Sequence, residues 1–295
     1  MNKKTLSWAI LILLSLVWGS SFILMKQGLK AFSSDEVAGL RITIASLCML
    51  PLLIKYYKID LKKYLKGLLL MGVFGNLIPA FLFTKAETQI SSSLTGTLNA
   101  LTPLFTVIIG VLYFKQAISR KQVIGVLVGF VGAVSLVAFA NDTGETSKNV
   151  MYCLLVAIAT ICYAISVNAI KAFLGDINSL QATAWSFTLI GPVAAIYLFG
   201  FTDVVAHACN HPYAMNALLY IGILAIMGSA ASVILYNVLI KMSGTVFASS
   251  CTYLIPIVAI CWGIFDNEMI NQIQVVAIVV IIAGIWLINP KRKGA

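Results

Sequence analysis

Long apolar runs separated by short polar segments follow one another along the whole chain. Two of them, Trp8–Met25 and Val275–Ile288, are predominantly apolar and lack the strict alternation of a half-buried strand. A helix needs about 20 mostly apolar residues to cross a bilayer, whereas a barrel strand alternates over about ten. Because lipid offers the backbone no hydrogen-bond partners, these runs predict membrane-spanning helices.

The apolar runs predict ten helices joined by short polar connections. The expected fold is therefore an all-α polytopic membrane protein with ten transmembrane helices. The expected helices cover residues 7–29, 36–54, 64–84, 90–114, 121–140, 150–170, 178–200, 214–240, 245–265 and 271–289. The longest connections are the basic stretch at residues 55–66 and the loops at 141–149 and 201–212.

The composition narrows the class of protein. Of the 295 residues, 60% are hydrophobic and only 10% are charged, against about 25% charged in ordinary soluble domains. This balance excludes a soluble enzyme, a disordered protein and a nucleic-acid binder of any usual kind. The lipid bilayer is the expected partner, and no nucleic acid is expected.

The net charge of +10 reflects the orientation of the helices in the membrane and does not indicate an acidic partner. Along the ten-helix ladder, fifteen of the twenty basic residues fall on one side and eight of the ten acids on the other. Loops rich in Lys and Arg stay on the cytoplasmic side. The pattern predicts cytoplasmic N- and C-termini in a multi-pass protein of the cell (inner) membrane.

Similar landmarks occur in both parts of the chain, at an offset that drifts only from 145 to 153 residues. Each part holds five expected helices, and five is odd, so the second copy enters the membrane inverted. Inverted repeats of this kind are typical of secondary transporters with a midplane site. We expect a repeat at 1–140, an extracytoplasmic linker at 141–149 and a second repeat at 150–295. The paired landmarks are Trp18 and Tyr163, Lys26 and Lys171, Gly75 and Gly228, Pro103 and Pro256, Gln116 and Glu268, and Gly132 and Gly284.

These landmarks resemble the drug/metabolite transporter superfamily, and within it the EamA-type family. The resemblance rests on Leu16-Val17-Trp18-Gly19-Ser20-Ser21-Phe22, Leu40-Arg41-Ile42, Asn99-Ala100-Leu101-Thr102-Pro103-Leu104 and Tyr253-Leu254-Ile255-Pro256-Ile257. It implies two inverted five-helix bundles, alternating access, and mostly export of amino acids, metabolites or drugs. One departure is that Lys115-Gln116 stands where the family usually has Gly-Glu, whereas the second half keeps Glu268.

Several polar and aromatic residues are expected near the helix centres, where an amide should face the bundle interior because lipid penalises it. Aromatic rings would stack on an apolar solute and amides would orient its polar end. The alternative is that these residues only hold helices together. The candidate lining residues for a small-molecule substrate are Trp18, Asn76, Asn99, Tyr163, Tyr236 and Tyr253.

Two cations near the outer ends of their helices are also candidates for substrate binding. Arg41 lies in the outer third of its helix and could bind a substrate carboxylate, or it could tie helices together by pairing with Asp35, Glu36 or Glu87. Lys26 is expected to extend to the outer interface. No acid lies at a helix centre, so proton antiport would need an edge residue such as Glu87 or Glu268, and the alternative is a facilitator without proton coupling.

Pro103 and Pro256 lie at equal depth in the two copies and are candidate hinges, although fixed packing bends would explain them equally well. The small residues Gly125 and Gly129 permit close helix packing, within the monomer or in a homodimer. The segment from His207 to His211 contains ligand types for a metal, but it lacks a second cluster and the usual spacing, so no metal site is predicted.

The expected function is a secondary transporter, most simply an exporter of small metabolites, amino acids or drugs, working by alternating access around a midplane cavity. A nucleotide-sugar or sugar-phosphate antiporter is the alternative, although it would need several cavity cations. An enzyme is not expected, because no base accompanies a buried nucleophile. No cofactor is expected.

Overall fold

The computed structural model describes residues 2–138, 150–258 and 272–288. The expected linker at 141–149, Glu268 and the end of the expected helix at 245–265 lie outside the described residues. In the first part of the chain the helices are α1 (Lys3–Gly28), α2 (Ser34–Lys55), α3 (Leu61–Leu69), η1 (Leu70–Leu77), α4 (Ile78–Glu87), α5 (Ser92–Asn99), α6 (Thr102–Leu112) and α7 (Arg120–Ala138).

The second part of the chain is also helical. Its helices are α8 (Val150–Phe173), α9 (Ser179–Phe201), α10 (Val204–Asn210), α11 (Ala214–Ile223), η2 (Leu224–Ala231), α12 (Ser232–Ser243), α13 (Thr245–Ser249), η3 (Ser250–Leu254) and α15 (Gln272–Ile288). The expected loop at 201–212 is therefore wrong in part, because α10 occupies most of it.

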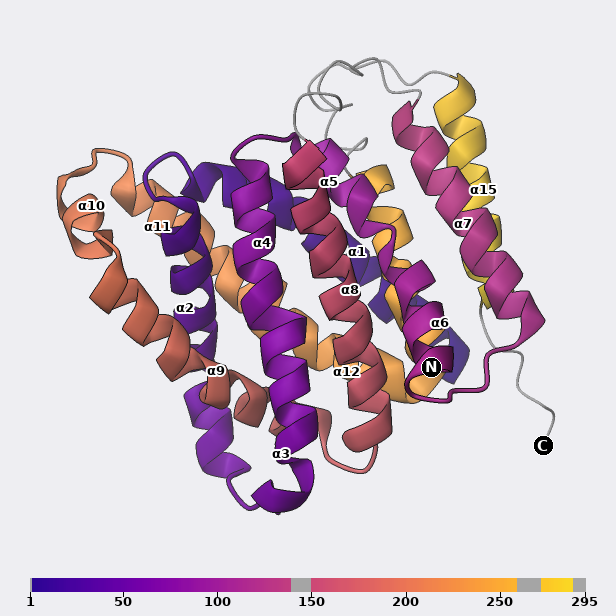
Figure 1. The fold of residues 1–295 in the computed structure, drawn as a ribbon, viewed down its shortest axis with the longest axis horizontal. Coiled ribbons are helices and arrows are strands. Elements are labelled where there is room, and N and C mark those ends of the chain that lie inside the picture. The colour runs from indigo at the N-terminus through magenta and orange to yellow at the C-terminus, as the bar shows by residue number, and fades with distance from the viewer. Residues whose placement is uncertain (1, 139–149, 259–271, 289–295) are drawn as a thin grey trace.

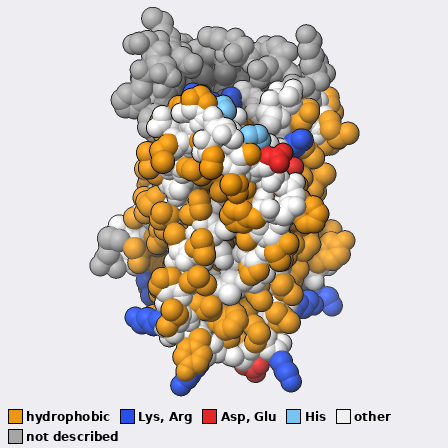
Figure 2. Space-filling model, turned by 90° about the vertical axis from the view of Figure 1, so that its left-hand side faces the viewer, with side chains coloured by type: hydrophobic (Ala, Val, Ile, Leu, Met, Phe, Trp, Pro, Cys, Tyr) orange, Lys and Arg blue, Asp and Glu red, His pale blue; other side chains and the backbone are white. Residues whose placement is uncertain are grey.

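Seven helices of the described residues are long and apolar enough to cross a membrane, with the continuous runs Leu61–Glu87 and Ala214–Ser243 among them. Two shorter apolar helices, Thr245–Val258 and Val275–Ile288, accompany these seven. Figure 2 shows a broad band of apolar side chains around the middle of one face, with Lys and Arg side chains toward its two ends and more of them at the lower end. Such a band matches the hydrocarbon core of a bilayer.

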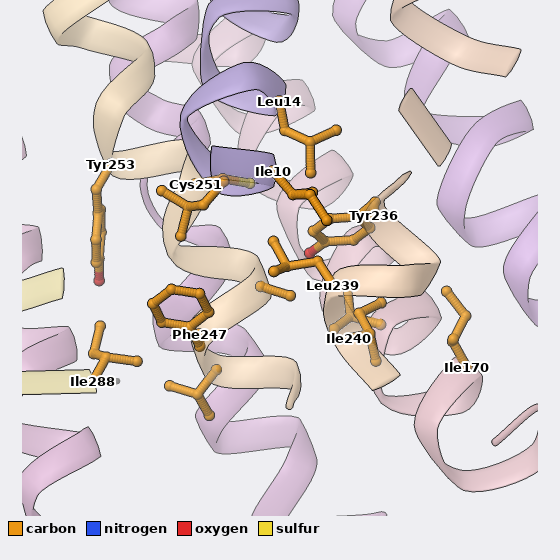
Figure 3. Packing of buried hydrophobic residues seen from close by; sticks show 14 of the residues in the cluster. Ile10, Leu14, Ile170, Tyr236, Leu239, Ile240, Phe247, Cys251, Tyr253 and Ile288 are labelled. Atoms are coloured by element: carbon orange, nitrogen blue, oxygen red, sulfur yellow. The ribbon is translucent and has the colours of Figure 1, made fainter. Parts of the chain in front are cut away.

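The helices pack as a bundle in which segments distant in sequence lie side by side. Helix α2 packs along α9, and α7 packs along α15 at the right of Figure 1. Helix α1 packs against α11 and α12, while α4 and η1 pack against α8. A large apolar cluster joins α1, α12, α13 and η3, as the side chains of Figure 3 show.

Two helices contain a π-helical turn, and each turn leaves backbone carbonyls to be satisfied by side chains. In η1, the Asn76 amide donates to the Met71 carbonyl at 3.2 Å. In η2, the Ser232 hydroxyl donates to the Met227 carbonyl at 2.6 Å, and the Trp18 indole donates to the Gly228 carbonyl at 2.9 Å.

Both π turns also carry a glycine that lies against a serine of another helix. A Cβ at Gly75 would lie 2.3 Å from Ser166 Oγ of α8, and a Cβ at Gly228 would lie 2.9 Å from Ser21 Oγ of α1. A side chain at either position would require the neighbouring serine to move, so the two glycines allow the π turns to lie close to α8 and α1.

A further helix is interrupted in each part of the chain, directly before a proline. The first break separates α5 from α6, and Pro103 lies in the first turn of α6. The second is the 3₁₀ segment η3, which ends at Leu254, two residues before Pro256. Proline has no N–H and its ring excludes the preceding helical turn, so both breaks lie where the backbone cannot continue an ideal ladder.

Candidate functional site

A central cavity of about 810 Å³, a volume that includes the space open at its mouth, lies between the helices of both parts of the chain. Helices α1, α2, α4, η1, α5 and α6 contribute walls from the first part, and α8, η2, α12 and η3 contribute walls from the second.

Six of the eight residues expected to bind substrate line this cavity. Three come from the first part of the chain before the break, on α1, α2 and η1, and the others lie on α5, α8 and α12. They are Trp18, Arg41, Asn76, Asn99, Tyr163 and Tyr236.

Aromatic rings form two groups on the cavity wall. The Trp18 and Tyr236 rings meet edge to face with centroids 5.0 Å apart. The Phe83 ring stacks on Tyr163 at 5.7 Å and contacts Phe22 at 6.0 Å. Each group joins a helix of the first part to a helix of the second, so both parts of the chain contribute aromatic ring surface to the cavity.

Arg41 is the one charged residue among the described residues that line the cavity. Its Nε donates to Ser229 Oγ of η2 at 2.7 Å, and Nη1 lies 3.9 Å from the sulfur of Met25. No carboxylate of the described residues forms an ion pair with it. The guanidinium therefore has the geometry and the free charge to take an anionic group.

The acids expected as partners of Arg41 are engaged elsewhere or unpaired. Glu36 completes the capping box of α2 through the Ser33 N–H at 2.8 Å and contacts His207 Nδ1 at 2.9 Å. Asp35 accepts a hydrogen bond from the Tyr197 hydroxyl at 3.2 Å. Glu87 is buried without a hydrogen-bond partner among the described residues.

The pairing of His207 with Glu36 also bears on the segment around α10. His207 Nδ1 contacts the Glu36 carboxylate, and His211 Nδ1 accepts a hydrogen bond from the Tyr213 N–H at 3.2 Å. Within the described residues, no group of three or more His, Cys, Asp or Glu side chains is arranged to hold a metal.

Tyr253 and Lys26 do not line the cavity. Tyr253 is fully buried, its hydroxyl donates to the Val126 carbonyl at 2.7 Å, and its ring lies in the space left by Gly129. It thereby ties η3 to α7. Lys26 is exposed. It lies on the last turn of α1, near the end of the bundle that holds α10.

The face with Gly125 and Gly129 is used inside the monomer. A Cβ at Gly125 would lie 2.8 Å from the Gly284 carbonyl oxygen, and a Cβ at Gly129 would lie 2.6 Å from the Tyr253 ring. The spacing allows close packing within the monomer or in a homodimer. In this structure the two glycines pack within the monomer, against α15 and η3.

Several lining residues were not singled out from the sequence. Phe22 and Phe83 look like ordinary core residues in an apolar run, and small hydroxyl residues look like helix contacts. Asn237 could have been predicted from the sequence, because an amide within an apolar run is expected to face the bundle interior, as Asn76 is. It donates to Thr183 Oγ1 at 2.9 Å, while its Oδ1 has no partner among the described residues. The hydroxyl residues concerned are Ser21, Thr102, Ser166 and Thr252.

Comparison with known proteins identifies the family of the chain. The model of the EamA-like transporter family matches residues 6–138 and again residues 150–289. The inner membrane transporter YedA of Escherichia coli K12 is 25% identical over 291 residues, which cover 95% of this chain and 89% of YedA. The transporter YyaM of Bacillus subtilis is 25% identical over 94% of this chain and 92% of its own length.

A third relative carries a more specific name. A probable terminal-alkyne amino-acid exporter of Streptantibioticus cattleyicolor is 23% identical over 97% of this chain and 94% of its own length. A solved crystal structure superposes with a TM-score of 0.74 at 14% identity, covering 97% of this chain and 96% of that one, and shows the same fold. With family matches spanning nearly the whole sequence, the chain belongs to the EamA-like transporter family and is a helical membrane transporter.

Proposed function

We propose that this transporter exports small zwitterionic or anionic solutes with an apolar body, amino acids with apolar side chains first among them. The observation that carries the proposal is the Arg41 guanidinium, which faces an aromatic cavity without a carboxylate partner among the described residues. Arginine binds carboxylates through paired, charge-assisted hydrogen bonds. The exporter relative gives independent support for the substrate class.

The rest of the cavity suits the remainder of such a molecule. The aromatic rings would contact an apolar side chain, and Asn76 and Asn99 supply amide groups in the same cavity. A sugar phosphate or nucleotide sugar carries more negative charge, and the described lining offers it one cation only. The lining therefore favours a carboxylate over a phosphate.

Alternating access between two inverted repeats would explain the matched features of the two parts. Trp18 and Tyr163 line the same cavity at the expected offset, and so do Asn99 and Thr252. The π turns η1 and η2 each pack on the first long helix of the other part. In this proposal Pro103 and Pro256 are the hinges, and both chain ends lie in the cytoplasm, as the distribution of Lys and Arg indicates.

The direct test is counterflow in proteoliposomes that contain the full chain. Radiolabelled leucine and phenylalanine should exchange with saturation, and glucose 6-phosphate should not compete. The expected effect of Arg41→Gln is a rise in KM of at least about tenfold, because a charge-assisted hydrogen bond contributes roughly 1.5–3 kcal/mol. Arg41→Lys should recover part of that loss, since it restores charge but not the paired geometry.

A matched control is Arg120→Gln, which removes an exposed cation at the start of α7. It should leave KM unchanged. Absence of saturable flux for either amino acid would refute the substrate proposal, and equal losses in both variants would refute the role of Arg41.

A further inference from the structure

The Glu87 carboxyl group stands apart from every other acid of the described residues. Glu87 is the last residue of α4, and only 5% of its surface is exposed. Both of its oxygens are sealed from solvent, and neither has a hydrogen-bond partner among the described residues. An ionised carboxylate in such a place costs several kcal/mol, because neither water nor a donor compensates its charge.

The neighbouring helices supply charge near this carboxyl group without an ion pair. Lys26 of α1 and Arg41 of α2 are the cations whose charges act on it, and Lys85 precedes it on α4. From α5 it faces the Ser92 hydroxyl, which is likewise buried and unpaired. Helix α8 packs against this end of α4 with Tyr152, Cys153 and Tyr163, none of which is charged at neutral pH.

Glu87 also lies close to the transport cavity. Phe83 is one helical turn earlier on α4, on the same face, and lines the cavity. Its ring closes the wall together with Phe22 and Tyr163. Movement of this aromatic group would open a path of one turn, about 5 Å, between the cavity and the carboxyl group.

We propose that Glu87 is the proton-binding site of a proton-coupled antiport, so that the conformation described here carries the neutral carboxylic acid. The inference rests on the proposed function for its substrate. When the α10 end is open to water and the substrate has left, hydration and the two cations stabilise the ionised carboxylate that remains. Protonation from that side neutralises it and allows the empty carrier to seal the end again.

The loaded carrier needs no proton in this scheme. A zwitterionic amino acid held by its carboxylate at Arg41 offers its ammonium group to the ionised Glu87. On the opposite side of the membrane, the arriving ammonium group takes the place of the proton, which leaves to water. One proton therefore moves in for each amino acid that moves out.

Accumulation driven by a pH gradient tests this scheme in proteoliposomes loaded with radiolabelled leucine or phenylalanine. Glu87→Gln keeps the shape and the acceptor oxygen but cannot titrate. We expect it to abolish the response to the gradient while substrate exchange persists, with KM raised by up to about tenfold for the lost charge. Glu87→Asp should keep the response and shift its pH dependence.

The matched control is Glu36→Gln. Glu36 is equally buried and lies at the same end of the bundle, but its oxygens are engaged by the Ser33 N–H and His207. It should keep the full gradient response. If Glu87→Gln accumulates substrate like the parent protein, or if Glu36→Gln loses the response to the same extent, the inference is overturned.

Infrared difference spectroscopy on the unliganded full chain gives a readout that does not depend on transport. A protonated, non-hydrogen-bonded carboxyl band is expected near neutral pH and should vanish in Glu87→Gln, or shift in Glu87→Asp if the first variant does not fold. Absence of this band in the parent protein would overturn the inference. Saturable exchange without any gradient response would overturn it while leaving the proposed function intact, whereas absence of exchange would refute the proposed function alone.

Discussion

Single side chains in this protein satisfy backbone groups that its irregular helices leave free. Asn76 bonds to a carbonyl of its own π turn, Ser232 at the start of α12 bonds to the Met227 carbonyl of η2, and Trp18 reaches from α1 to the Gly228 carbonyl of η2. In a dry environment an unpaired carbonyl is costly. Trp18 and Asn76 also line the cavity, so a substitution at either position changes both helix stability and the cavity wall.

Trp18→Phe separates these two effects at the residue scale. It keeps an aromatic ring against Tyr236 but removes the donor to the Gly228 carbonyl. We expect a loss of stability on the order of 1 kcal/mol, because one buried acceptor loses its partner. Thermal unfolding in detergent measures it. Trp8→Phe is the control, since Trp8 contacts the Phe247 ring without a comparable hydrogen bond, and equal losses would contradict the explanation.

At the scale of elements, glycine decides how closely helices approach. Helices α7 and α15 meet through Gly125, Gly129, Gly132 and Gly284, and a Cβ at Gly284 would lie 2.5 Å from the Gly129 nitrogen. That neighbour is backbone, so it cannot turn aside as a side chain could. The α7 and α15 pair thus depends on residues that carry no side chain at all.

Gly284→Ala should therefore destabilise the protein by about 1–3 kcal/mol, the usual cost of overpacking. The matched control is Gly222→Ala in α11, where an added Cβ would meet nothing within 4 Å. This control should be neutral or slightly stabilising, because alanine favours a helix over glycine. Unfolding midpoints of the two variants measured side by side decide the matter, and similar values would contradict this account of the α7 and α15 contact.

For the whole molecule, polar contacts tie the two parts of the chain together at both ends of the cavity. At the α10 end, His207 meets Glu36, and the Tyr213 hydroxyl donates to Gln27 at 2.9 Å. At the opposite end, Gln116 bonds to Asn168 of α8 at 2.9 Å and accepts from Lys171 at 3.1 Å. A neutral amide both donates and accepts here, which gives Gln116 a role that a carboxylate could not fill in this geometry.

The Lys63 and Asp176 pair at that end allows a prediction about pH. Hydrogen bonds from Lys63 at 2.6 Å and from Tyr64 at 2.9 Å hold the pKa of Asp176 below its usual range. A depressed folded-state pKa contributes stability above the unfolded value, near 3.9 for Asp, and the contribution is lost only as pH falls through the folded value.

Between pH 5 and pH 8 this pair should consequently add no pH dependence to unfolding or transport. Asp176→Asn should leave any gradient response in that range unchanged, and its effect on stability should be small, because both side chains are more than half exposed. Unfolding curves of parent and variant across that pH range provide the check. A pH response that disappears with Asp176→Asn would assign titration to this pair instead of Glu87.

The helical membrane class and the family could be predicted from the sequence, because long apolar runs and the order of the motifs can be read directly along the chain. The sequence also placed six of eight candidate residues on the cavity, since polar and aromatic residues at mid-helix avoid lipid. Tyr253 was expected to line the cavity but packs against α7 instead, because the depth of a residue along a helix does not determine which neighbouring helix its ring contacts.

What the tertiary structure alone decided are the relations between helices. The π turns, the α10 helix, the partner of His207 and the isolation of Glu87 all depend on contacts across more than a hundred residues or on local backbone shifts that no periodicity records. The sequence determines which residues must avoid lipid. Only packing determines which of them find partners. Arg41 at the cavity and the buried Glu87, neither of which forms an ion pair within the described residues, carry the functional proposals.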